Sequence, residues 1–148
     1  MLARLALFAS LMAAAVSAKS PKVPGVVVDH QDASTREYIG SPSILTAPNG
    51  DYVATHDLFG KGSTSTTSAE TKVFLSHNRG KRWKQAASFH EQFWSNLFLS
   101  EKRIYLMGTS AEYGRIVIRA SDDNGKTWSD AHYLTLDAGY HTAPVPMA

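Results

Sequence analysis

The sequence has 148 residues, of which 43% are hydrophobic and 19% are charged, and it contains no cysteine. Its folded state must therefore be held by a core rather than by disulfides, and thiolate metal sites and cysteine nucleophiles are excluded. The net charge is only +2 and no block of like charge occurs, which argues against a surface for nucleic acid or for membranes.

Residues 1–18 have the pattern of a signal peptide. A short basic stretch ending at Arg4 is followed by an apolar run over residues 5–15 and by small residues at 16–18, typical of a cleavage site. The apolar run is shorter than the about 20 residues that cross a bilayer. We expect a secreted or periplasmic protein that has no membrane span after cleavage. A buried N-terminal helix is the alternative interpretation.

The mature chain shows the period-2 alternation of strands and no convincing helical periodicity. Residues 19–40 contain Pro, Gly, Asp and Ser and are expected to form a lead-in segment, in which 26–28 is a candidate strand. Two units of four strands follow, and a long loop is expected over residues 57–71 of the first. The expected strands are 43–47, 52–56, 72–76 and 84–88 in the first unit and 94–99, 103–109, 115–120 and 132–136 in the second.

One motif occurs in both units, between the third and fourth expected strands. Residues 121–128 read Ser-Asp-Asp-Asn-Gly-Lys-Thr-Trp, the S-x-D-x-G-x-T-W pattern of an Asp-box, and residues 76–83 read Ser-His-Asn-Arg-Gly-Lys-Arg-Trp. The glycines of the two copies are 45 residues apart, and so are the tryptophans. A single copy would also suit an ordinary hairpin turn, but two copies in register indicate a structural repeat.

Each residue type in the motif has a physical role. The Asp or Asn accepts hydrogen bonds from backbone N–H groups, the Gly adopts the positive φ of the turn, and the Trp packs a large ring against the neighbouring sheet. The expected structural residues are Ser76, Asn78, Gly80 and Trp83 in the first copy and Ser121, Asp123, Gly125, Thr127 and Trp128 in the second.

This repeat in a strand-rich chain predicts an all-β fold, a β-propeller built from four-stranded antiparallel blades. We expect blade one at about 41–90, blade two at about 91–137 and the start of a third blade at 138–148. Propellers have about 4–8 blades, so the ring is expected to be incomplete, with open strand edges. The chain is therefore expected to be a fragment of a longer protein, or else to assemble from several copies.

The turns of an antiparallel blade alternate between its two ends. The motif turns lie at one end, whereas the loops from second to third strand and from blade to blade lie at the other. That second end collects carboxylates, imidazoles and aromatic rings, which carbohydrate hydrolysis requires. The candidate catalytic residues are Asp57, Glu91, Glu112 and His141, and the candidate substrate-binding residues are His56, Trp94, Tyr113 and Tyr140. The six histidines show no spacing typical of a metal site, so we expect neither a metal nor another cofactor.

Several stretches resemble the sialidase-like, or BNR-repeat, superfamily of β-propellers. They are the two Asp-box copies, residues 40–44 with 48–51, residues 93–97 and residues 140–146, which together cover nearly the whole mature chain. The chain looks most like exported bacterial members described as sialidase-family or exo-glycosidase proteins. The resemblance implies a carbohydrate substrate or ligand.

Sialidases also carry an Arg-Ile-Pro type motif at the start of the first strand, whose Arg clamps the substrate carboxylate by bidentate pairing. The matching stretch here is Gly40-Ser41-Pro42, and the loop after the second strand offers Asp57 and Lys61 but no arginine. The Tyr nucleophile of sialidases and its Glu partner would lie in blades beyond this sequence. True sialidase activity is therefore disfavoured.

The sequence as a whole predicts a secreted, sialidase-like propeller glycoside hydrolase that is exo-acting on terminal sugars of a glycan. Two alternatives stay open. A non-catalytic propeller that binds a glycan or a protein would need no acid and base, and a structural fragment would have no function of its own.

Overall fold

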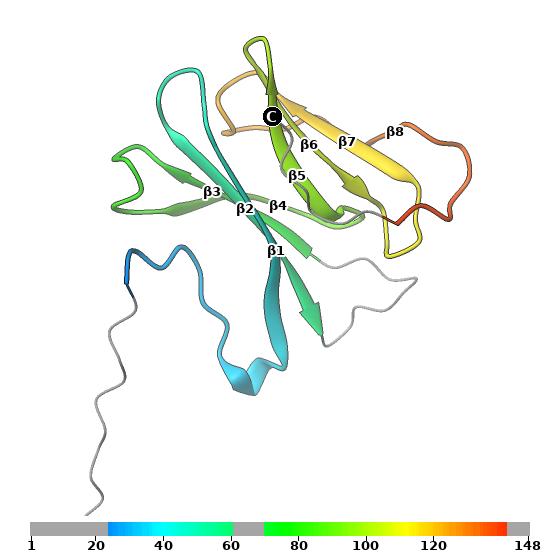
Figure 1. The fold of residues 1–148 in the computed structure, drawn as a ribbon, viewed down its shortest axis with the longest axis horizontal. Coiled ribbons are helices and arrows are strands. Elements are labelled where there is room, and N and C mark those ends of the chain that lie inside the picture. The colour runs from blue at the N-terminus through cyan, green and yellow to red at the C-terminus, as the bar shows by residue number, and fades with distance from the viewer. Residues whose placement is uncertain (1–23, 61–69, 142–148) are drawn as a thin grey trace, which may run out of the picture.

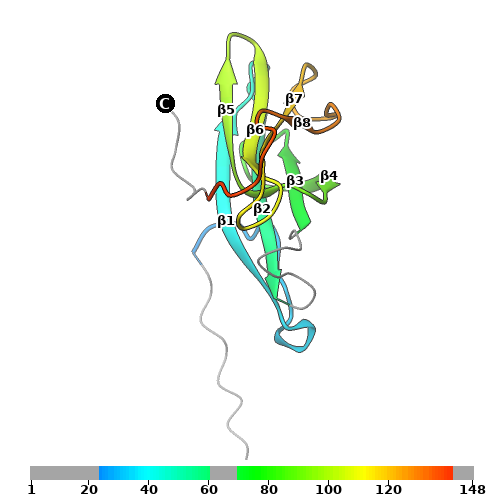
Figure 2. The same ribbon diagram turned by 90° about the vertical axis from the view of Figure 1, so that its right-hand side faces the viewer.

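The computed structural model describes residues 24–60 and 70–141. The predicted signal peptide, the middle of the predicted 57–71 loop and most of the predicted third blade lie outside these ranges. The described residues form two four-stranded antiparallel sheets, in the strand orders β1-β2-β3-β4 and β5-β6-β7-β8 (Figure 1). Within this part of the chain the sheets do not close into a ring (Figure 2). The predicted fold class, an incomplete all-β propeller, is confirmed.

We call the two sheets blade one and blade two. Blade one consists of β1 (Glu37–Thr46), β2 (Tyr52–Gly60), β3 (Glu70–Ser76) and β4 (Lys84–Phe89). Blade two consists of β5 (Phe93–Ser100), β6 (Arg103–Thr109), β7 (Ile116–Ser121) and β8 (His132–Tyr133). A 3-10 helix of three residues (Ala33–Thr35) precedes β1, and among the described residues no helix is long and apolar enough to cross a membrane.

The largest difference from the predicted strands is in β1 and β2. β1 begins at Glu37, inside the predicted lead-in segment, and β2 continues to Gly60, so Asp57 is a strand residue rather than the start of a loop. The two extensions pair with each other, from Glu37 opposite Gly60 to Gly40 opposite Asp57. They are strand because each supplies the other's hydrogen bonds, which local composition does not reveal. The candidate strand at 26–28 is absent.

The core lies between the two blades, where buried aliphatic side chains of both sheets meet. Its buried members are Ala47, Val53, Val73 and Leu75 from blade one and Leu97, Ile104 and Leu106 from blade two. Trp128 of the second motif packs against this cluster and contacts Phe89 of β4 edge to face, with ring centroids 6.1 Å apart. The motif of blade two therefore helps to join the blades.

The two motif copies fold into the same turn. In each copy the glycine N–H donates to the serine hydroxyl at 2.8 Å, and the tryptophan Nε1–H donates to the glycine carbonyl at 3.1 Å. Asn78 Oδ1 accepts from the Arg82 N–H at 2.8 Å, as Asp123 Oδ1 accepts from the Thr127 N–H at 2.8 Å. The Thr127 hydroxyl also donates to Asp123 at 2.6 Å. The first copy therefore keeps the turn and loses one hydrogen bond.

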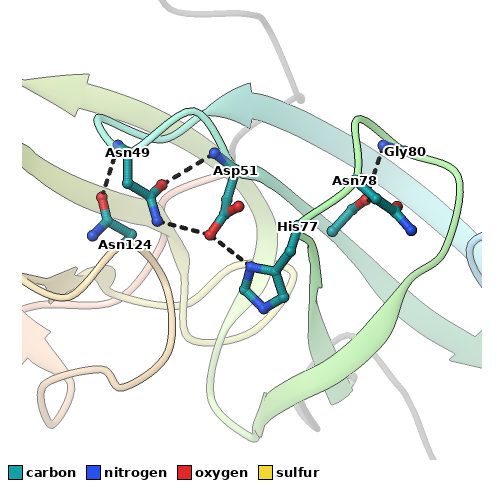
Figure 3. A network of polar contacts seen from close by, with 7 residues as sticks. Asn49, Asp51, His77, Asn78, Gly80 and Asn124 are labelled. Atoms are coloured by element: carbon teal, nitrogen blue, oxygen red, sulfur yellow. Dashed lines mark hydrogen bonds and ion pairs between the residues drawn. The ribbon is translucent and has the colours of Figure 1, made fainter.

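Polar contacts connect these turns with the β1–β2 turn (Figure 3). Asp51 Oδ2 accepts from Asn49 Nδ2 at 2.7 Å and lies 2.7 Å from Nδ1 of His77 in the first motif. The Asn49 N–H donates to Asn124 Oδ1 in the second motif at 3.3 Å. Side chains thus bridge the two blades at the motif end, which is opposite to the end that carries the candidate site residues.

Gly125 tests how closely the second motif packs on blade one. Its φ is +87°, and a Cβ there would lie 3.1 Å from side-chain carbons of Val53 and Leu75. Gly50 has the same φ of +87°, but nothing lies within 4 Å of its Cβ position. We expect Gly50→Ala to cost about 1–2 kcal/mol from backbone strain, and Gly125→Ala to cost about 1–3 kcal/mol more from overpacking. Urea denaturation of the two variants measures the difference, and equal losses would contradict close packing.

Candidate functional site

The first strands of the two blades, β1 and β5, lie next to each other and kink at corresponding places (Figure 1). The register of β1 shifts after Gly40, and that of β5 shifts after Phe93. At each shift one residue has a positive φ, 49° for Ser41 and 45° for Trp94. A ring as bulky as that of Trp94 rarely accompanies this backbone conformation, so surrounding contacts must support it.

Asp57 lies beside both kinks and is only 1% exposed. Thr71 places its Oγ1 2.5 Å from Asp57 Oδ1 and 2.8 Å from the backbone oxygen of Gln92. A hydroxyl has one proton to donate, so Thr71 cannot donate to both acceptors at once. If Asp57 is protonated, it donates to Thr71 and Thr71 donates to Gln92, which satisfies all three groups.

The electrostatics of Asp57 agree with this arrangement. Burial raises the pKa of Asp57 to about 7, and hydrogen bonds from Thr71, the Trp94 amide, the Ser41 hydroxyl and the Ser95 amide oppose only part of the rise. Asp57 Oδ2 is buried without a hydrogen-bond partner in the described part of the chain, which further penalises the carboxylate. The carboxyl therefore contacts both kinks and can hold a proton near neutral pH.

Trp94 belongs to a cluster of side chains from three segments, which we call the ring cluster: Trp94, Tyr113, Tyr140 and His141. The Trp94 and His141 centroids are 4.2 Å apart, edge to face, and those of His141 and Tyr113 are 5.3 Å apart. The Tyr140 N–H donates to the Gly114 carbonyl at 3.0 Å, which ties the last segment to the β6–β7 loop. Tyr113 is 55% exposed and Tyr140 is 40% exposed. Four of the eight candidate site residues are thus gathered at one accessible place.

His56 is not part of the ring cluster. Adjacent strand residues point to opposite faces, so His56 points away from Asp57 and from blade two. Its ring stacks on Phe74 with centroids 5.2 Å apart, and its Nε2 lies 2.9 Å from Asp29 Oδ2. The side chain lines a largely apolar pocket of about 500 Å³ on the far face of blade one.

The two candidate glutamates differ in their surroundings. Glu91 accepts a hydrogen bond from the Tyr133 hydroxyl at 2.6 Å, and the guanidinium carbon of Arg115 lies 3.6 Å from the Tyr133 ring centroid. Glu112 occupies the turn between β6 and β7, next to Tyr113 of the ring cluster. No group of three or more metal-ligating side chains occurs among the described residues.

Thr71 and Phe59 contribute to the site, although the sequence did not single them out. Thr71 is fully buried and orients the Asp57 carboxyl. Phe59 contacts Phe93 edge to face at 5.3 Å, and Phe93 in turn stacks on Trp94 at 4.9 Å. The spacing of Asp57 and Phe59, two residues apart on one strand face, is the signal that reveals Phe59 once β2 is known to continue.

No family model matches the sequence, and no curated protein matches it. Three solved structures are similar. They are the Penicillium chrysogenum α-L-arabinanase complexed with arabinobiose (22% identity, TM-score 0.48, 64% of this chain and 31% of that one), the Trypanosoma rangeli sialidase (22%, 0.46, 57% and 13%) and the Fusarium graminearum α-L-arabinofuranosidase Arb93A in complex with an iminosugar inhibitor (16%, 0.46, 71% and 33%). The chain spans a third or less of the length of each. The two adjoining antiparallel blades, each with the same turn before its last strand, have the fold of a sialidase-like propeller.

Proposed function

We propose that these two blades belong to a secreted glycoside hydrolase of sialidase-like propeller type, which acts on terminal sugars of a glycan. The observation that supports it is the accessible ring cluster directly in front of Asp57, a buried carboxyl whose pKa is about 7. Amphipathic rings offer apolar faces to a sugar and polar edges to its hydroxyls. A carboxyl that stays protonated near neutral pH suits general acid catalysis.

The side chains then divide the work. Trp94, Tyr113 and Tyr140 contact the sugar, and the imidazole of His141, in contact with two of these rings, gives or takes a proton at its edge. Asp57 holds the Trp94 backbone in its kinked conformation through the amide hydrogen bond and keeps a proton behind it. Glu112 is the carboxylate next to the cluster in the chain.

The test is hydrolysis of a panel of neutral and acidic oligosaccharides by the full chain, measured as released reducing sugar. His141→Ala is expected to lower the rate by about 10²-fold or more, the usual contribution of an acid–base group. His77→Ala is the matched control, because His77 is an exposed histidine at the opposite, motif end of blade one. Equal rates for the two variants would reject the assignment of His141.

A non-catalytic glycan-binding propeller is the second candidate. It is favoured by the burial of Asp57 and by the hydrogen bond that Tyr133 donates to Glu91, which occupy two of the three candidate carboxylates. In the same panel, saturable binding that depends on Trp94 with no released sugar would establish this alternative.

A further inference from the structure

The ring cluster is one end of a longer row of aromatic side chains that crosses from blade two to blade one. From Trp94 the contacts continue through Phe93 to Phe59, and Phe59 stacks on Tyr38 of β1 with centroids 6.3 Å apart and planes 11° from parallel. We call this the aromatic row, whose members are Tyr38, Phe59, Phe93, Trp94, His141 and Tyr113.

The two ends of the aromatic row are its exposed parts. Tyr38 is 63% exposed and Tyr113 is 55% exposed, whereas Phe93 between them is 4% exposed. Tyr38 pairs directly with Phe59 across β1 and β2, so both point to the same face of blade one as Asp57. An exposed tyrosine stacked flat on a phenylalanine is held in place, and its outer face is open to a ligand.

The row also occupies the place where a carboxylate clamp would stand. Gly40 lies opposite Asp57 in the register, and a Cβ at Gly40 would come within 2.5 Å of Cε2 of the Phe59 ring. A guanidinium at this position, which matches the clamping arginine of sialidases in the sequence resemblance, would have to displace Phe59. The aromatic side chains that fill the space instead carry no fixed charge, and Asp57 beside them is neutral when protonated.

We propose that the aromatic row binds a linear, uncharged glycan chain, with Tyr38 as a second stacking site on blade one. The inference rests on the proposed function only in taking a carbohydrate as the ligand. Phe59 and Phe93 separate Tyr38 from Trp94, so one sugar on Trp94 does not reach Tyr38, whereas a chain of several sugars does. The outer faces of Tyr38 and Tyr113 then hold sugars at the two ends of the bound chain.

The experiment is calorimetric titration of the full chain with neutral arabino-, xylo- and cello-oligosaccharides of increasing length, and with sialyllactose as an acidic comparator. In the unmodified protein we expect affinity to rise with chain length in one neutral series. Tyr38→Ala is expected to weaken binding of the longest members about three- to tenfold and to leave the disaccharide unchanged, while Trp94→Ala weakens all lengths.

Tyr105→Ala is the matched control, because Tyr105 also stacks on a phenylalanine, Phe98, with centroids 5.1 Å apart, but lies outside the row. Thermal melts of the three variants show whether each is folded. Loss at every length in Tyr38→Ala, or no loss at any length, would overturn the second stacking site and leave the ring cluster intact. Preference for sialyllactose would overturn the uncharged ligand, and absence of binding to every sugar would reject the proposed function itself.

Discussion

Replacing Asp57 by asparagine is expected to flatten the pH dependence of folding stability between about pH 4 and about pH 7. The ordinary pKa of the carboxyl is 3.8, and burial raises it to about 7 in the folded state. Between these values the folded protein holds a proton that the unfolded chain has released, so stability falls as pH rises. The contribution of Asp57 is complete below its unfolded pKa and is lost above about pH 7. Asparagine does not titrate and can still accept a hydrogen bond from Thr71.

The shift of about three units corresponds to an upper limit of roughly 4 kcal/mol. Urea denaturation at a series of pH values measures it as the difference between the unmodified protein and Asp57→Asn, which cancels the other titrating groups. Asp137→Asn, at an exposed carboxylate, is the control and should follow the unmodified protein. Parallel curves for the unmodified protein and Asp57→Asn would show that Asp57 is ionised throughout.

Leu106→Ala is expected to cost about 2–5 kcal/mol in the free energy of unfolding, because it removes buried carbon atoms and leaves a cavity. Leu106 is 0% exposed and belongs to the cluster that both blades share. Leu136→Ala is the matched control, since Leu136 is 95% exposed and its loss should change stability by about 0.5 kcal/mol or less. Urea denaturation of both variants decides the point, and a small effect at Leu106 would mean that the blades do not depend on one common core.

Much of the fold follows from sequence pattern alone. The strand predicted at 103–109 is β6 (Arg103–Thr109) residue for residue, because Arg103, Ile104 and the residues after them alternate between exposed and buried. The recurrence of one turn motif was enough to separate two blades, because its glycine and tryptophan have backbone and packing roles that few other residues can fill.

The candidate site was harder to predict, because it depends on long-range pairing. Asp57 and Gly60 belong to a stretch whose glycines and charges are typical of a loop, and only the partner segment that begins at Glu37 makes it a strand. The end of the blade was predictable from turn parity, whereas the face required knowing that β2 continues. His56 and Asp57 are neighbours in sequence, yet they serve different faces of the same sheet.

The kinks at Ser41 and Trp94 put one side chain of each blade outside the strict alternation of its strand. In blade one that side chain is a small hydroxyl that reaches Asp57, and in blade two it is a large indole in the ring cluster. The backbone at the two positions is alike although the chemistry is not. A propeller built in this way can diversify by exchanging a single residue per blade, and its binding preference can change while its sheets, its core and its turn motifs stay the same.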